Sequence, residues 1–460
     1  PTVKDMLKTN KQWIFIILLV IIAIIVFIKW REYYYKKLLH TDTLTQIPNK
    51  QYFMKTAEKI LDNNSDKSYL LTSLDARNFK LINERFGHIV GDQTLMNIAK
   101  NIKSKFHKNG LYARSQSDSF LILVEDTSQN RELLKSLVDL DISIHNTTNY
   151  KVPLKIGVCP IPRYNPALSL SLYIDRANIA KKYTSARNTN YICYFTDDMN
   201  KKLNMKNMIE SEMVRALSKG EFVVYYQPKY EIANDTIIGA EALVRWNHKE
   251  KGIISPGVFI PVFERNGFIV DLDFYVYEQV LKMQKHRLDM GKKVIPISMN
   301  VSRCHLSDTN FVDKLEAVVA KYKVPKQYIE MEITESIFSQ EDSSAIALIY
   351  NLKEHGFTIS MDDFGSGYSS LNLLRKVQID TLKIDKVFID STEDVQRSQV
   401  IVEEIINMAS KIHVKTICEG VETQSQRDFL KNAGCNMVQG YFYSKPLPYE
   451  DFSDLLNSSK

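Results

Sequence analysis

Eight short apolar runs, each closing on a polar residue, constrain the fold of the second half of the chain more than any other feature. The residues that close them are Gln227, Glu241, Asn300, Glu332, Asp362 with Asp363, Lys383, Glu419 and Gln439. After the first gap, each interval is long enough for a helix, and strands that alternate with helices predict an α/β barrel of the TIM type. The first interval is too short for a right-handed crossover, so the first two strands should form an antiparallel hairpin. We therefore expect a modified TIM barrel with one antiparallel strand.

The polar residues at the ends of these strands predict a metal site. A single such residue is usually a solvated loop end, but eight in succession, with five acids among them, are hard to explain in that way. The C-terminal ends of the strands carry the chemistry in such barrels. Carboxylates that converge there repel one another unless hard cations neutralise them, and oxygen ligands without His or Cys favour Mg²⁺ or Mn²⁺. Two such ions about 3.5–4 Å apart suit in-line hydrolysis of a phosphodiester.

Motifs around the same residues resemble those of the EAL-domain cyclic-di-GMP phosphodiesterases, from about residue 205 to 450. They are Tyr226-Gln227-Pro228, Glu241-Ala242-Leu243-Val244-Arg245-Trp246, Asn300-Val301-Ser302, Glu332-Ile333-Thr334-Glu335-Ser336, Asp362-Asp363-Phe364-Gly365-Ser366-Gly367, Lys383-Ile384-Asp385, Glu419-Gly420-Val421-Glu422 and Gln439-Gly440-Tyr441. The resemblance implies hydrolysis of cyclic-di-GMP to the linear dinucleotide pGpG.

The resemblance also implies a role for each site residue. Two divalent cations, Mg²⁺ or Mn²⁺, would be held by Glu241, Asn300, Glu332, Asp362, Asp363 and Glu419. Lys383 would orient or polarise the attacking water, and Glu419 is the candidate general base. Substrate binding falls to Gln227, Arg245 and Gln439, and the planar fork of Arg245 suits a phosphate.

One further motif resembles the family's coupling loop between the active site and a dimer interface. It consists of Glu335 and the segment from Asp363 to Ser370, and it leads us to expect a homodimer. A non-enzymatic cyclic-di-GMP receptor that signals through a membrane helix is the alternative. That alternative would be favoured by missing metal ligands, and every ligand position that aligns is retained.

The first half of the chain reads as an α+β sheet domain in which Asp75 and Asp118 meet at strand ends. Its motifs resemble the diguanylate cyclase (GGDEF) domain over most of residues 40–197. They are Asp42-x-Leu44-Thr45-x-x-Pro48-Asn49, Asp75-x-x-x-Phe79-Lys80-x-Ile82-Asn83 and Gly87-His88-x-x-Gly91-Asp92. Lys182 and Arg187 stand where the family has a late phosphate-binding basic pair.

The signature loop of that family is degenerate here. GGDEF has become Gln116-Ser117-Asp118-Ser119-Phe120, and Gln and Ser hinder both the positive φ angles and the close nucleotide approach that Gly allows. We therefore predict no cyclase activity. Gln116, Ser117 and Ser119 also argue against a bifunctional cyclase and phosphodiesterase. Two readings of the domain stay open. It is either a spacer or dimer contact, or a regulatory module that binds GTP through Asp75, Asn83, Asp92 and Asp118.

An uncharged segment, Trp13 to Ile28, predicts a membrane helix at about residues 13–30. Its sixteen residues rise about 24 Å, slightly short of the ~30 Å hydrocarbon core, and Trp13 and Trp30 bracket it. A signal peptide and a buried core helix are the rival interpretations. The five cysteines are few and form no CxxC pair, which indicates reduced thiols. We expect a single-pass protein of a cytoplasmic membrane with its catalytic part in the cytoplasm.

Together these features predict four segments. Residues 1–37 hold the membrane helix, 38–200 the degenerate GGDEF domain, 201–220 a linker helix and 221–460 the EAL phosphodiesterase domain. The net charge of +6 is too mild for a chain of 460 residues to imply a nucleic acid polymer as a partner.

Overall fold

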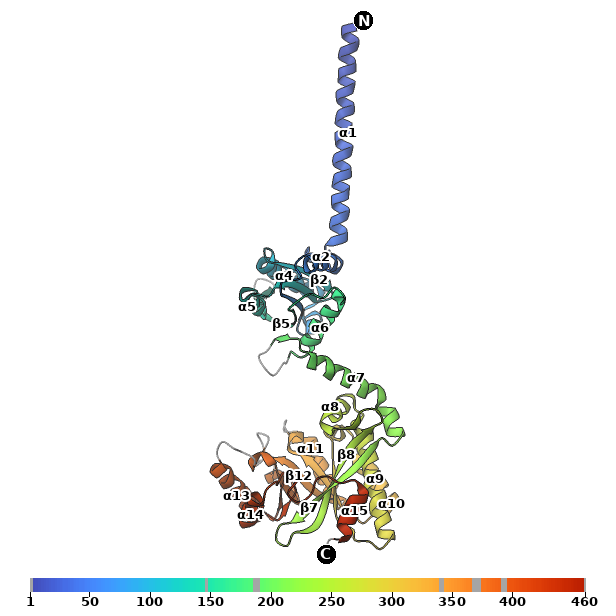
Figure 1. The fold of residues 1–460 in the computed structure, drawn as a ribbon, viewed down its shortest axis with the longest axis vertical. Helices are drawn as coiled ribbons and strands as arrows, with labels where there is room; N and C mark the ends of the chain where they lie inside the picture. The colour runs from blue at the N-terminus through green and yellow to red at the C-terminus, as the bar shows by residue number, and fades with distance from the viewer. Residues whose placement is uncertain are drawn as a thin grey trace. The chain divides into compact units, whose positions relative to one another are not determined.

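The computed structural model describes residues 3–144, 148–184, 191–338, 343–365, 374–389 and 395–458. The chain divides into two compact units, Pro1–Asn204 and Met205–Lys460, which we describe separately (Figure 1).

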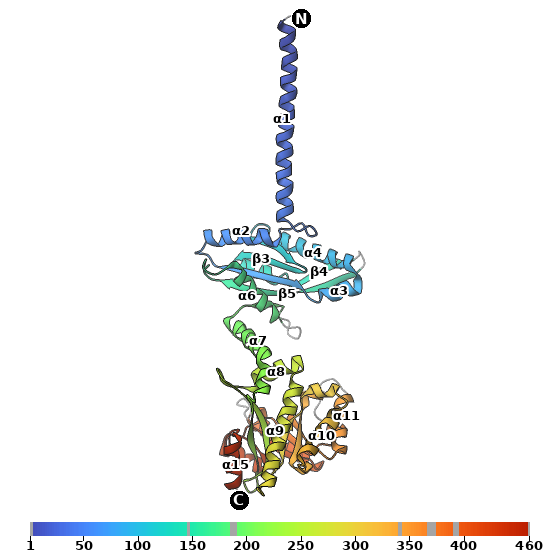
Figure 2. The same cartoon turned by 90° about the vertical axis from the view of Figure 1, so that its right-hand side faces the viewer.

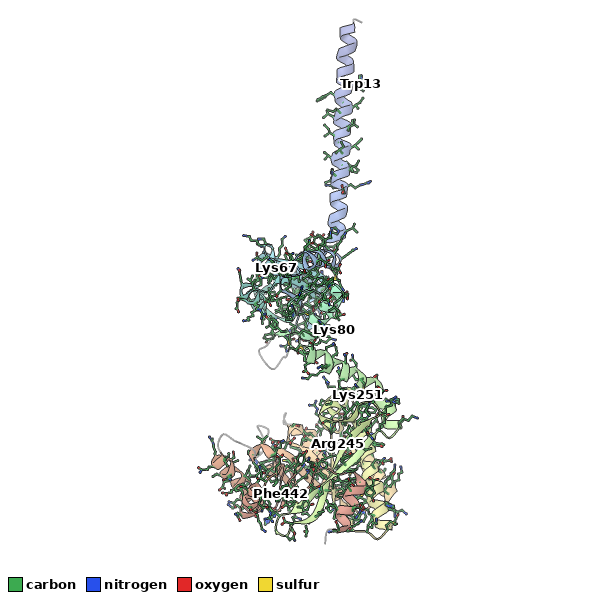
Figure 3. The ribbon with its side chains drawn as sticks, viewed as in Figure 1. Trp13, Lys67, Lys80, Arg245, Lys251 and Phe442 are labelled. Carbon is green, nitrogen blue, oxygen red and sulfur yellow. The ribbon has the colours of Figure 1, made fainter. Side chains whose placement is uncertain are left out.

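The first helix, α1 (Val3–His40), contains the uncharged segment, and the side chain of Trp13 projects from it (Figure 3). Within the part of the chain that the structure describes, no helix is both long enough and apolar enough to cross a membrane. The prediction of a membrane helix is therefore not supported. A physical reason is that an uncharged run of sixteen residues is shorter than the hydrocarbon core. The expected location in a cytoplasmic membrane depended on that helix and stays a prediction.

The remainder of the first unit is a sheet with helices on both faces (Figure 2). Its strands are β1 (Tyr69–Ala76), β2 (Gly110–Gln116), β3 (Ser119–Glu125), β4 (Asp139–Ile144), β5 (Thr148–Ile161) and β6 (Ile192–Tyr194), in the order β2-β3-β1-β5-β4 with β6 beside β5. The helices are α2 (Lys50–Asn63), α3 (Phe79–Phe86), α4 (His88–Phe106), α5 (Ser128–Lys135) and α6 (Leu170–Lys182).

Strand β1 lies at the centre of this sheet, antiparallel to both β3 and β5. Because neighbouring side chains of a strand point to opposite faces, the apolar residues of β1 contribute to two hydrophobic cores, one on each face of the sheet. Leu70 packs with residues of α4, and Leu71 packs with residues of α2 and α6. This is the α+β arrangement that the sequence predicts, and the pairing of Asp75 with Ser119 brings the end of β1 to the turn that holds Asp118.

The second unit is a closed barrel of eight strands. Its strands are β7 (Phe222–Glu231), β8 (Thr236–His248), β10 (Ile297–Asn300), β11 (Ile329–Thr334), β12 (Thr358–Phe364), β13 (Thr381–Ile384), β14 (Lys415–Cys418) and β15 (Met437–Val438), with the short β9 (Gly252–Ile254) added beside β8. Pairing of β10 with β8 closes the ring. Strand β7 runs antiparallel to both of its neighbours, β8 and β15, whereas the other barrel pairs are parallel. The predicted modified barrel with one antiparallel strand is therefore confirmed.

Helices surround this barrel (Figure 1). They are α8 (Pro256–Asn266), α9 (Ile269–Asp289), α10 (Phe311–Tyr322), α11 (Ser343–Glu354), α13 (Val395–Lys411), α14 (Gln424–Asn432) and α15 (Tyr449–Ser458), with short 3₁₀ turns η1 (Arg303–Ser307), η2 (Lys326–Tyr328), η3 (Glu335–Phe338) and η4 (Lys386–Phe388). Before the barrel, helix α7 (Asp197–Ser218) covers most of the predicted linker. Its residues Ile209 and Ala216 are buried in an aromatic cluster with Phe222 and Trp246.

The two faces of the barrel strands carry different side chains. In β11, Met331 packs outward into the core beneath the helices, while Glu330 and Glu332 alternate with it and are also buried. The interior is therefore polar, with Lys229, Ser298, Glu330, Glu332, Ser360, Thr381 and Lys383 all buried. Because buried charges need partners, this interior requires a matched set of acids and lysines.

Candidate active site

Four carboxylates surround one buried lysine at the C-terminal ends of the barrel strands. The Nζ atom of Lys383 lies 3.5 Å from Oε2 of Glu241, 3.0 Å from Oδ1 of Asp362 and 2.7 Å from Oε1 of Glu419. It also forms an ion pair with Oε1 of Glu332. Residues that are far apart in the sequence therefore share one site, and the acids outnumber the lysine at its centre.

The register of the strands explains this convergence. Parallel pairing sets Asn300 opposite Glu332, and Thr334 opposite Asp362, so successive strands end at the same level. Nδ2 of Asn300 lies 3.4 Å from Oε1 of Glu241. The hydroxyl of Tyr277 donates to the carbonyl of Asn300 at 2.9 Å and holds the end of β10 in place.

Burial and crowding shift the acids in opposite directions. Burial, reinforced by the charge of Glu332, raises the pKa of Glu241 to about 7. Burial also raises the pKa of Asp362 to about 8, against the lowering effect of Lys383. Glu332 is buried too, but the ammonium groups of Lys383 and Lys229 outweigh burial and lower its pKa to about 2. The four acids raise the pKa of Lys383 well above its usual value, although burial alone would lower it.

The donor set fits a divalent cation. Carboxylate oxygens of Glu241, Glu332 and Glu419 lie within 4.8 Å of one another. Oε2 of Glu332 is buried without a hydrogen-bond partner among the described residues, so it is available as a ligand. These are hard oxygen donors, which suit Mg²⁺ or Mn²⁺.

The predicted coupling loop begins at the edge of this site. Oε2 of Glu335 accepts a hydrogen bond of 2.9 Å from the backbone N–H of Gly365. Asp363 adopts a left-handed φ of 57°, and burial, followed by the charge of Asp385, raises its pKa. The segment 366–370 lies outside the described residues. The start of the loop is therefore tied to η3.

Gln439 orients Glu241, and Gln227 of the antiparallel strand in turn holds Gln439. Nε2 of Gln439 donates to Oε2 of Glu241 at 2.7 Å and to Oε1 of Gln227 at 3.1 Å. A cavity of about 280 Å³ opens above them. It is lined by Gln227, Glu241, Leu243, Asp362, Lys383, Lys386, Glu419, Gly420, Glu422, Gln439, Gly440 and Tyr441. Arg245 is not among these lining residues. Its guanidinium lies over the ring of Tyr225, 5.7 Å from the centroid.

Sequence reasoning missed a second ion pair beneath the site. Nζ of Lys229 lies 2.8 Å from Oε2 of Glu330 and 3.8 Å from Oε2 of Glu332. A signal was present, because Lys229 is two residues after Gln227 and therefore shares its face of the strand.

Another missed pair lies behind Asn300. Nε2 of His305 lies 2.9 Å from Oδ2 of Asp273, which also accepts the N–H of Ser302. His305 is buried. Asp273 lines a separate cavity of about 240 Å³ with Asn300 and Tyr277.

The acidic site of the first unit contains Lys181, which the sequence analysis did not single out. Nζ of Lys181 lies 2.7 Å from Oδ1 of Asp75, whereas Lys182 is exposed and Arg187 lies outside the described residues. Burial, together with the charge of Asp75, raises the pKa of Asp118.

Asn83 and Asp92, two of the residues predicted to bind GTP, lie on α3 and α4. A Cβ built on Gly91 would stand 1.9 Å from Oδ1 of Asn83, so Asn83 lies against the residue that precedes Asp92. In the degenerate loop, Ser117 adopts a φ of 52°, so the replacement of Gly by Ser does not prevent this conformation. Two hydrogen bonds from the guanidinium of Arg114 to the carbonyl of Ser117 hold that conformation.

Comparison with protein families agrees with this geometry. The family model "EAL domain" matches residues 210–446, and "Diguanylate cyclase, GGDEF domain" matches residues 39–188. A closed barrel with one antiparallel strand and an acidic rim, preceded by a cyclase-like domain, is the organisation of GGDEF-EAL proteins. The chain belongs to the EAL family and carries a GGDEF domain before the barrel.

Curated relatives share both domains. The chain is 28% identical over 415 residues to the "Bifunctional diguanylate cyclase/cyclic di-GMP phosphodiesterase MucR" of Pseudomonas aeruginosa, which covers 89% of this chain and 60% of the relative. It is 31% identical over 432 residues to "Signaling protein YkoW" of Bacillus subtilis, which covers 91% of this chain and 53% of the relative. The chain thus spans less than two thirds of the length of either relative.

Solved structures show the same barrel. "PaMucR Phosphodiesterase, c-di-GMP complex" superposes with a TM-score of 0.51 at 32% identity, covering 53% of this chain and 99% of that one. "Structure of EAL enzyme Bd1971 - cAMP bound form" has a TM-score of 0.52 at 20% identity and covers 85% of this chain and 95% of that one, which shows the fold alone.

Proposed function

We propose that the barrel hydrolyses cyclic-di-GMP to pGpG. The observation that carries the proposal is the convergence of Glu241, Glu332, Asp362 and Glu419 on Lys383 beside an open cavity of about 280 Å³. Membership of the EAL family supports it, as does the similar solved barrel whose title names a cyclic-di-GMP complex.

The residues that would hold two divalent cations are Glu241, Asn300, Glu332, Asp362, Asp363 and Glu419. When bound, Mg²⁺ or Mn²⁺ ions would neutralise these acids and polarise the phosphodiester and the attacking water. Arg245 is still the residue predicted to bind a phosphate of the substrate, although in this structure its guanidinium lies over Tyr225.

The protein groups then have separate tasks. Water adds to one phosphorus and the P–O3′ bond breaks, which opens the ring and leaves a 5′-phosphate. Glu419 suits the role of proton acceptor because it is the least buried of the four acids around Lys383, with 25% of its side chain exposed. The leaving 3′-oxygen takes its proton from solvent. Lys383 orients the attacking water, and the pair of Gln227 and Gln439 keeps Glu241 aimed at the site.

For the first unit, we propose a regulatory role without cyclase activity. Gln116 and Ser117 replace glycines of the signature loop, which removes the space that a nucleotide needs there. Regulation by GTP through Asp75, Asn83, Asp92 and Asp118 is the finer part of this proposal. The contact of Asn83 with Gly91 supports a shared GTP-binding region for Asn83 and Asp92.

We also propose that the protein acts as a homodimer. Apolar side chains are exposed on η4 and α13, namely those of Val387, Val395, Val400 and Ile401, and exposed apolar patches mark interaction surfaces. Light scattering after gel filtration should give twice the chain mass, and the mass of a single chain would contradict the proposal.

One assay separates the candidate functions. The full chain is incubated with cyclic-di-GMP and Mg²⁺ or Mn²⁺, with and without GTP, and the nucleotides are resolved. We expect pGpG. Unchanged cyclic-di-GMP with tight binding would instead identify the alternative, a non-enzymatic receptor, and product formed from GTP alone would identify a cyclase.

A matched pair of variants tests the site itself. Glu241→Gln keeps the shape of the side chain but removes a charged ligand, so turnover should fall by at least 100-fold. Glu250→Gln is the control, since its side chain is 75% exposed. Both variants should retain the circular dichroism of the parent. Full turnover by Glu241→Gln would refute the assignment.

A further inference from the structure

The first unit brings two acids together in a place that would suit a cation. Asp75 is the penultimate residue of β1, and its backbone pairs with Ser119, the residue after Asp118. The charge of Asp75 helps to raise the pKa of Asp118, so the two carboxylates interact. Domains of the GGDEF family are expected to hold a metal here, so the fit of these residues to a metal needs a test against the structure.

The place is already filled by a side chain of the same unit. Lys181 is 9% exposed, and its Nζ donates to Oδ1 of Asp75 at 2.7 Å and to Oγ of Ser73 at 3.0 Å. Ser73 in turn donates to Oδ1 of Asn178 at 2.7 Å. Two of the three ammonium donors are thus used, and the lysine is held by both the strand and the helix.

The packing of α6 fixes the position of this ammonium group. A Cβ built on Gly157 of β5 would stand 2.0 Å from the carbonyl of Ala177 and 2.3 Å from the backbone nitrogen of Lys181. Helix α6 therefore lies directly against β5, without room for a side chain between them. Because Gly157 pairs with Ser73, this close contact places the backbone of Lys181 near Ser73, two residues before Asp75.

We infer that Lys181 is a built-in substitute for a divalent cation, and that the first unit binds no Mg²⁺ or Mn²⁺ at Asp75 and Asp118. The ammonium group occupies a coordinating oxygen of Asp75 and offsets the charge of one of only two carboxylates, whereas Lys383 of the barrel is shared by four. The remaining negative charge is therefore too small to hold a divalent cation beside the lysine. A nucleotide bound by this unit would then lack a metal bridge from its phosphates to Asp75. The predicted GTP module is limited to contacts that need no metal.

The inference is tested by counting bound Mn²⁺ per full chain, from the electron paramagnetic resonance signal of the free ion. Asp75→Asn in the otherwise natural chain should leave the count unchanged, because no ion sits there. A loss of one Mn²⁺ on this substitution would overturn the inference. This arm depends only on the natural chain and an isosteric variant.

A second arm removes the lysine. Lys181→Met should raise the count by one Mn²⁺ per chain, and the double variant Lys181→Met/Asp75→Asn should lose that gain. Lys182→Met is the matched control, since the neighbouring lysine is exposed and should change nothing. A folded Lys181→Met variant that binds no additional Mn²⁺ would show that the lysine does not take the place of a cation, and would overturn the inference.

Discussion

The buried ion pair beneath the active site gives a quantitative prediction. Lys229 is 3% exposed and Glu330 is 7% exposed, and their charged atoms are 2.8 Å apart. Lys229 also lies 3.8 Å from a carboxylate oxygen of Glu332. Removing the lysine alone, as Lys229→Met, leaves a buried carboxylate without its cation. Breaking such a pair costs about 3–5 kcal/mol in the free energy of unfolding.

The same reasoning predicts recovery when both partners are removed. The double variant Lys229→Met/Glu330→Met replaces the pair with unbranched apolar side chains of similar length. Exchange of a buried pair for apolar residues of similar volume is often neutral or stabilising, so the double variant should recover most of the loss. The coupling energy of this cycle should therefore exceed about 2 kcal/mol in magnitude.

The assay can be confined to the unit that holds the pair. The three tryptophans are Trp13, Trp30 and Trp246, and Trp246 is fully buried in the second unit, close to the start of the barrel. In a Trp13→Phe/Trp30→Phe background, urea unfolding followed by tryptophan fluorescence therefore reports on the second unit.

Lys249→Met serves as the control, because its side chain is 60% exposed and exposed pairs contribute little. A loss below about 1 kcal/mol for Lys229→Met, or a double variant as unstable as the single one, would refute the reasoning.

Three further predictions follow from buried groups. Arg287→Leu should lower the free energy of unfolding of the second unit by about 2–4 kcal/mol in the same fluorescence assay, because Arg287 is 1% exposed and its guanidinium joins α9 to α15. An unfolding free energy equal to that of the parent would contradict this prediction. Gly440→Ala should reduce turnover of cyclic-di-GMP at least tenfold, since the new Cβ would stand 2.2 Å from the carbonyl of Val421 and displace the neighbouring glutamine; unchanged kinetics would count against that packing. Burial raises the pKa of Cys159 to about 12 and that of Cys435 to about 11. In the native protein at pH 8, iodoacetamide should therefore label neither thiol until urea is added, as measured by mass spectrometry. Rapid labelling of either native thiol would contradict this prediction.

The barrel could be predicted because the end of each strand is visible in the sequence. Each run of apolar residues stops at a polar residue, and the short interval between Gln227 and Glu241 excludes a helix, so both the closed ring and the hairpin follow. The acids at those ends could be assigned to one rim for the same reason. Their pairing around Lys383 could not, because it depends on side-chain directions within the barrel.

The residues that were missed lie in the interior rather than at the strand ends. Lys229 and Glu330 are on the same inward faces as the site residues but two positions deeper, where an apolar core is the usual expectation. Lys181 was also missed, because the sequence does not show which of two neighbouring lysines faces the sheet. Adjacent helical residues point about 100° apart, so Lys181 faces Asp75 while Lys182 is exposed.

The central claim is that the acidic residues at the rim of the barrel bind divalent cations that contact cyclic-di-GMP. Crystals of the full chain grown with cyclic-di-GMP and Mn²⁺ test it directly through the anomalous signal of manganese. The account predicts two anomalous peaks about 3.5–4 Å apart, within 2.5 Å of oxygens of Glu241, Glu332 and Asp362. Substrate bound in the cavity with no manganese at these carboxylates, and with Lys383 still paired to all four acids, would contradict it.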